Sequence, residues 1–151
     1  MLTGLFLVSC QADRPDKIFG KAILNTNLIA GFNPEIYGER LEKGGEAQKS
    51  VDIQIQVIEK AIRDIKDIKT SDEDSKALKE QSIKLFETVL PVYKNEYSAY
   101  AKLYAAKDSS PEEKQALLKK IEQNYLPKTN VLFDELYNMG QQYQINVKWG
   151  R

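Results

Sequence analysis

The stretch AQKSVDIQIQVIEKAIRDIKDIK, residues 47–69, decides the fold class of this chain. Its apolar residues recur every three or four positions, at Val51, Ile55, Ile58, Ile62 and Ile65. This spacing places them in one stripe along a helix. The shorter part VDIQIQV alternates apolar and polar residues as a β-strand does, but the helical period continues beyond it. The stretch therefore predicts a long amphipathic helix.

The same period predicts a helix before this stretch and another after it. Upstream, apolar positions spaced by 3 and 4 predict a first helix over residues 18–36, interrupted near Asn33-Pro34, and Gly44-Gly45 separates it from the second. Downstream, a stripe from Leu78 to Leu103 predicts a third helix that ends near Lys107. Residues 70–74 supply its N-cap and an acidic first turn.

A fourth helix is predicted from Ser110 to about Gln142. Ser110 and Glu113 match a capping box, and Pro111 occupies the first helical position. Four helical runs with short connections indicate an all-α, antiparallel four-helix bundle in one domain, residues 17–151. Pro91 and Pro127 fall inside two of the runs, and each is expected to kink its helix.

The last residues change pattern. Tyr143, Ile145, Val147 and Trp149 alternate with polar residues, which predicts an extended C-terminal tail along the bundle.

Composition restricts the chemistry. The 151 residues hold 22 Lys+Arg and 22 Asp+Glu, so no net charge points to nucleic acid or to an anionic membrane surface. Histidine is absent, which removes the commonest general base and metal ligand. Cys10 is the only cysteine, and no nucleophile or phosphate-loop motif occurs. We therefore expect no enzyme activity, no metal site and no cofactor.

Five tyrosines form the candidate binding surface. Tyr93, Tyr97, Tyr100 and Tyr104 are spaced by 4, 3 and 4, so they share one face of the third helix. Tyr125 is expected beside Tyr93 across the hairpin, because each lies 16 residues from the turn centre near Ser109. Two interpretations stay open: a stripe at the edge of the core, covered by neighbouring helices, or an exposed aromatic surface for a protein or a sugar ring.

The N-terminal segment suggests where the protein works. Leu7-Val8-Ser9-Cys10 follows a short apolar run and resembles the lipobox of bacterial lipoproteins. The resemblance implies that the Cys10 thiol receives a diacylglyceryl group and that signal peptidase II cuts before Cys10. The alternative is an apolar N-terminus with an incidental cysteine.

The resemblance divides the N-terminus into two parts. Residues 1–9 would be a signal peptide that begins upstream of Met1, because they lack the Lys or Arg that precedes an apolar signal core. Residues 10–16 would be a lipidated tether. By analogy with lipoprotein sorting, Gln11 in place of Asp points to the outer membrane.

The sequence thus predicts a lipid-anchored, non-catalytic binding or interaction module of the cell envelope, with no nucleic-acid partner. The alternative function is a carrier or sensor that holds a small apolar or sugar-like ligand between kinked helices. The two differ physically, because a carrier needs an enclosed cavity and an interaction module needs an exposed surface.

Overall fold

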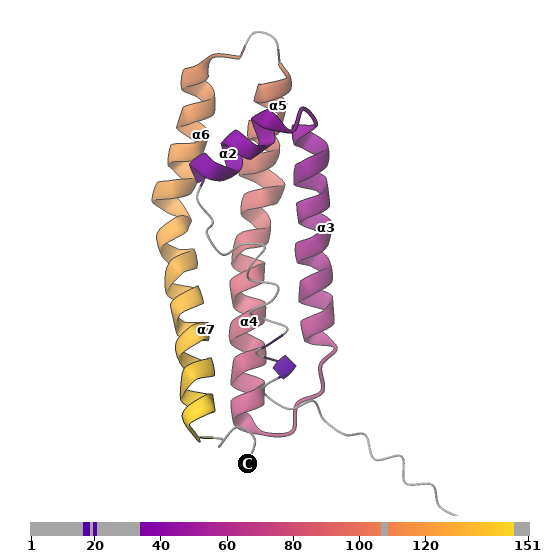
Figure 1. Ribbon diagram of the computed structural model, residues 1–151, viewed down its shortest axis with the longest axis vertical. Helices are drawn as coiled ribbons and strands as arrows, with labels where there is room; N and C mark the ends of the chain where they lie inside the picture. The colour runs from indigo at the N-terminus through magenta and orange to yellow at the C-terminus, as the bar shows by residue number, and fades with distance from the viewer. Residues whose placement is uncertain (1–16, 19, 21–33, 107–108, 147–151) are drawn as a thin grey trace, which may run out of the picture.

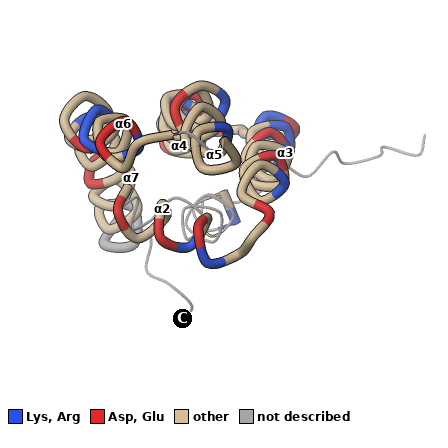
Figure 2. The backbone as a smooth tube through the Cα atoms, turned by 90° about the horizontal axis from the view of Figure 1, so that it is seen from above, with Lys and Arg blue, Asp and Glu red and all other residues tan. Residues whose placement is uncertain are grey.

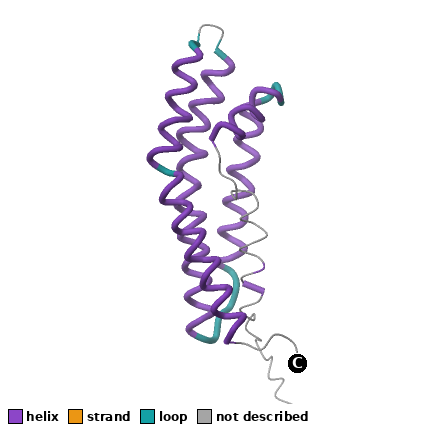
Figure 3. The backbone as a smooth tube through the Cα atoms, turned by 60° about the vertical axis from the view of Figure 1, so that its left-hand side comes forward, coloured by secondary structure: helices purple, strands orange, loops and turns teal. Residues whose placement is uncertain are grey.

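The computed structural model describes residues 17–18, 20, 34–106 and 109–146. The lipobox-like segment and the predicted tether lie outside these residues, as does most of the first predicted helix. Within the described ranges every regular element is helical and no strand occurs, so this part of the chain is all-α (Figure 3). No helix in these ranges is long and apolar enough to cross a membrane.

The elements follow one another with short connections. In chain order they are α2 (Pro34–Lys43), α3 (Ala47–Lys66), α4 (Glu73–Val92), the π-helix η1 (Tyr93–Tyr97), α5 (Ser98–Ala105), α6 (Pro111–Asn124) and α7 (Leu126–Asn146).

The long helices form three columns that pack side by side. One column is α3, the second is α4, η1 and α5 end to end, and the third is α6 followed by α7. Figure 1 shows that neighbouring columns run in opposite directions. Viewed from above in Figure 2, the columns make an arc and the short α2 lies across its open side. The described part of the chain is therefore a helical bundle.

At the predicted helix boundaries, the structure shows a side-chain cap and a glycine turn. The Asp72 side chain caps α4 by accepting a hydrogen bond from the Ser75 backbone N–H at 2.8 Å. The Ser75 hydroxyl also donates to Asp72, and these bonds lower the pKa of the Asp72 carboxyl. Between α2 and α3 the chain turns at Gly45. Its backbone φ of 69° is one that residues with a side chain rarely adopt.

The capping box predicted at Ser110 is confirmed. The Ser110 hydroxyl accepts a hydrogen bond from the Glu113 backbone N–H at 3.1 Å. In return the Ser110 backbone N–H donates to Glu113 Oε2 at 3.1 Å. Pro111 is the first residue of α6, where its missing N–H would have had no partner.

The core lies between the columns and contains the predicted stripes. Val51, Ile58, Ile62 and Ile65 of α3 are buried, and the α4 column adds Leu78, Leu85 and Val89. Ile18 is fully buried in the same core, although it precedes α2 in the chain. The apolar period therefore identified the inward faces of α3 and α4 correctly, whereas Ile36, at the end of the first predicted stripe, is 66% exposed.

The two prolines occupy different helical environments. Pro91 lies inside α4, two residues before η1, and has no N–H to donate to the carbonyl one turn earlier. The single helix predicted from residue 110 to 142 is instead divided at Tyr125 into α6 and α7. Pro127 is therefore the second residue of α7. A proline in the first turn of a new helix sacrifices no hydrogen bond, which accounts for the division.

The prediction of an extended tail is wrong for residues 143–146, which continue α7 to Asn146. Extending an existing helix gains about one hydrogen bond per residue, so a short alternating segment attached to a long helix stays helical. Val147 and Trp149 lie outside the described residues.

Replacing Ser110 by Ala removes the capping box and should lower the free energy of unfolding by about 1 kcal/mol, measured by urea titration. Ser50→Ala is the control, because Ser50 is exposed inside α3, where Ala is the better helix former. Equal stability of Ser110→Ala and the unmodified protein would contradict the role assigned to the cap.

Candidate functional site

Three of the five candidate tyrosines lie in the core. Tyr93, Tyr97 and Tyr100 are 2%, 0% and 2% exposed, so they do not form an open aromatic surface. Tyr104 and Tyr125 are half-buried and pack against the core. The interpretation of the stripe as exposed is therefore wrong for the first three residues, because α2 and the neighbouring columns cover that face.

The covering residue is Tyr37 of α2, which the tyrosine spacing of the third helix did not reveal. Its ring meets Tyr97 edge to face, with centroids 4.5 Å apart, and Tyr93 at 5.3 Å. The Arg40 guanidinium lies 4.8 Å from the centroid of the Tyr37 ring. Such aromatic pairs add about 0.5–1.5 kcal/mol beyond the area they bury, so this cluster holds α2 against the bundle.

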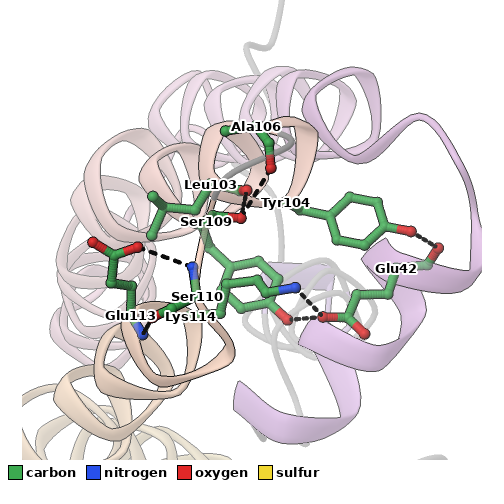
Figure 4. Close-up of polar contacts among 9 residues, drawn as sticks. Glu42, Leu103, Tyr104, Ala106, Ser109, Ser110, Glu113 and Lys114 are labelled. Carbon is green, nitrogen blue, oxygen red and sulfur yellow. Dashed lines mark hydrogen bonds and ion pairs between the residues drawn. The ribbon is translucent and has the colours of Figure 1, made fainter.

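The other two tyrosines of the stripe attach α2 through their hydroxyls. Tyr100 donates to Glu42 Oε1 at 2.7 Å, and Tyr104 donates to the Glu42 backbone carbonyl at 2.8 Å. Figure 4 shows the Tyr104 hydroxyl pointing at Glu42 near the C-terminal end of α2. One stripe of four tyrosines therefore serves two roles: rings that fill the core and hydroxyls that fix Glu42.

Helix α6 approaches α2 from the other side. Lys114 Nζ lies 3.8 Å from Glu42 Oε1 and 5.4 Å from the centroid of the Tyr104 ring (Figure 4). Gly38 permits close packing, since a Cβ there would lie 3.0 Å from Leu118 Cδ1 and 3.2 Å from the Tyr100 hydroxyl. A glycine at this position is what lets α2 cross so near to α6.

Next to this crossing lies an open cleft of about 780 Å³, which we take as the candidate site. Its lining residues are Glu35, Glu39, Glu42, Tyr100, Pro111, Lys114, Gln115, Leu118, Lys119 and Glu122. The α2 side contributes only carboxylates, whereas the α6 side carries both lysines. A volume in the range of small-molecule sites and a charged lining suit the binding of a small polar ligand.

Tyr125 belongs to a separate buried contact. Its hydroxyl donates to Glu96 Oε1 at 3.2 Å, and Lys120 Nζ donates to the same oxygen at 2.9 Å. Glu96 is a residue of η1 and only 7% exposed, so these two donors compensate a buried carboxylate. The hydrogen bond with Glu96 raises the pKa of the Lys120 ammonium. The sequence did not single out Glu96, because its neighbour Lys120 comes from another helix.

Neither the described residues nor the comparisons with known proteins identify a chemical activity for this chain. No group of three or more His, Cys, Asp or Glu residues in the described ranges could hold a metal ion. The chain matches no protein-family model, no curated protein and no solved structure.

Burial raises the pKa of the phenolic groups of Tyr37, Tyr93, Tyr97 and Tyr100. For Tyr100 the hydrogen bond to the Glu42 carboxylate adds to the effect of burial. Above about pH 10 an unfolded chain loses tyrosine protons that the folded chain keeps. The free energy of unfolding should therefore fall as the pH rises beyond this point, and should show no contribution from these groups below it.

Replacing Tyr97 by Phe tests this pH dependence. The variant should lose stability less steeply above about pH 10, by up to about 1.4 kcal/mol per pH unit, because one buried tyrosine no longer titrates on unfolding. Urea titrations at a series of pH values measure the slope. A tyrosinate titration in which all the absorbance rises with a midpoint near pH 10, while circular dichroism still shows folded helices, would contradict the burial of these groups.

Proposed function

We propose that this chain is a lipid-anchored, non-catalytic binding module of the bacterial cell envelope, and that the α2–α6 cleft is its binding site. In this proposal Cys10 carries the lipid through a thioether, residues 10–16 form the tether and the helical domain begins at residue 17. Gln11 makes the outer membrane the proposed location. The protein would bind its ligand without transforming it.

The observation that carries the proposal is the placement of the cleft relative to the point where the chain enters the bundle. In Figure 1 the indigo segment that precedes α2 lies near the end at which α3 connects to α4, whereas α2 lies near the opposite end. From Cys10 to residue 17 the chain can span at most about 25 Å. A bundle tethered at its near end would present the cleft away from the membrane, where a ligand can reach it.

The proposed architecture extends the observed bundle by one column. We propose that residues before α2 form a fourth helix along the open side of the arc, which would complete an antiparallel four-helix bundle with kinks near Pro91 and Pro127. The complete burial of Ile18 supports this arrangement, because Ile18 begins the apolar stripe of the first predicted helix. The start of α2 at Pro34 agrees with the interruption expected there.

The carrier alternative has less support. A carrier for an apolar ligand would need an enclosed cavity between the kinked helices. Tyr93 and Tyr97 follow Pro91 in the chain, and Tyr37 of α2 packs against them. The centroids of these three rings are 4.5–5.3 Å apart, so the rings fill that part of the interior. The cleft, by contrast, opens to solvent and has a charged lining, which favours a ligand bound at the surface.

The anchor is tested by expressing the full chain and its Cys10→Ala variant in the native host with radiolabelled palmitate. The unmodified protein should incorporate label and sediment with the membrane fraction, and the variant should do neither. Ser9→Ala is the control, because it keeps both the sulfur and a small residue before the cleavage site. Unmodified protein recovered from the soluble fraction, unlabelled and with residues 1–9 attached, would overturn the proposal.

A further inference from the structure

We infer that the α2–α6 cleft binds a small cationic amino acid or short peptide, recognised by its ammonium groups on the α2 side and its carboxylate on the α6 side. This inference deepens the proposed function, since it assumes that the cleft is the binding site. It does not depend on lipidation. It follows from the position of the charges, from their incomplete pairing and from the balance between them.

The charges of the cleft are divided unevenly between its two helices. Glu35, Glu39 and Glu42 recur every three or four residues, so they line one face of α2 over about 10 Å. Both cationic residues of the lining, Lys114 and Lys119, come from α6. The fourth glutamate of the lining, Glu122, also comes from α6. A ligand between the two helices would therefore meet only carboxylates on the α2 side, and both ammonium groups beside one carboxylate on the α6 side.

The two sides do not neutralise each other. The Lys114–Glu42 ion pair is long, at 3.8 Å, and the same Glu42 oxygen already accepts the Tyr100 hydroxyl at 2.7 Å. Glu39 pairs outside the cleft with Lys43, at 3.2 Å and with both side chains well exposed. Within the described part of the chain, Lys119 has no carboxylate within 4 Å. These charged groups can therefore still form ion pairs or hydrogen bonds with a ligand.

The balance of charge decides which class of ligand fits. The lining holds four glutamates and two lysines, which favours a ligand that carries more ammonium groups than carboxylates. Lysine, a cationic amino acid, has two ammonium groups and one carboxylate. The Leu118 side chain and the Pro111 ring, which also line the cleft, offer apolar contact to the methylene groups between them.

Lysine and its analogues test each part of this recognition in turn. The probes are L-lysine, cadaverine, which lacks the carboxylate, and 6-aminohexanoate, which lacks the α-ammonium. The dipeptide Ala-Lys distinguishes a peptide from a free amino acid as the source of the ligand. Each probe is titrated into the full chain carrying Cys10→Ala, so that lipid plays no part. Two-dimensional NMR follows the backbone amides of Gly38 and Leu118.

L-lysine or Ala-Lys should bind more tightly than cadaverine and 6-aminohexanoate, and added salt should weaken all of them. Lys119→Gln should weaken lysine binding up to about fivefold without weakening that of cadaverine, because only lysine carries the carboxylate. Glu39→Gln should weaken both by a similar factor. Lys43→Gln is the matched control: it breaks the same surface ion pair without removing a lining residue, and should not weaken binding.

Two results would overturn the inference. One is the absence of any shift at Gly38 and Leu118 with L-lysine or Ala-Lys. The other is equal affinity for lysine and cadaverine that Lys119→Gln leaves unchanged. Neither result bears on the lipid anchor, which the palmitate experiment tests separately, and circular dichroism of each variant establishes that its helices are intact.

Discussion

The contact between the Tyr37 ring and the rings of Tyr93 and Tyr97 is the interaction on which the candidate site depends. Helix α2 has 10 residues, and a helix of that length is marginal in water without tertiary contacts. Tyr37 and Leu41 supply the buried apolar surface that holds it, and Gly38 lets it approach α6 closely. Without these contacts Glu35, Glu39 and Glu42 would have no fixed position, and the cleft would lose one of its two sides.

The π-helix explains how one column meets partners on two sides. A π turn holds an extra residue, which widens the arc of side chains that can face inward. In η1, Tyr93 and Tyr97 turn toward α2, while Glu96 turns toward Lys120 and Tyr125 of the α6–α7 column. Pro91 lies two residues earlier, where its missing N–H already weakens the regular hydrogen-bond ladder. The irregular segment therefore joins the aromatic core to the junction of α6 and α7.

What could be predicted from the sequence is what depends on near neighbours in the chain. The inward face of α3 and the cap at Ser110 follow from spacings of three and four residues, and both are confirmed. Spacing also placed the four tyrosines on one face, but it could not say what covers that face, since Tyr37 lies more than 50 residues before Tyr93. The cleft was missed for the same reason: its two sides belong to helices joined only by tertiary contacts.

The absence of net charge gives the cleft a particular importance for recognition. A chain with equal numbers of acidic and basic residues creates little long-range field to attract a ligand. Under physiological salt, charges interact over only about 8 Å, so selectivity must come from groups that lie close to the ligand. The cleft concentrates an excess of carboxylates and places three of the four on α2, opposite the two lysines of α6. Recognition here therefore depends on the local order of charges, which the crossing of α2 over α6 creates.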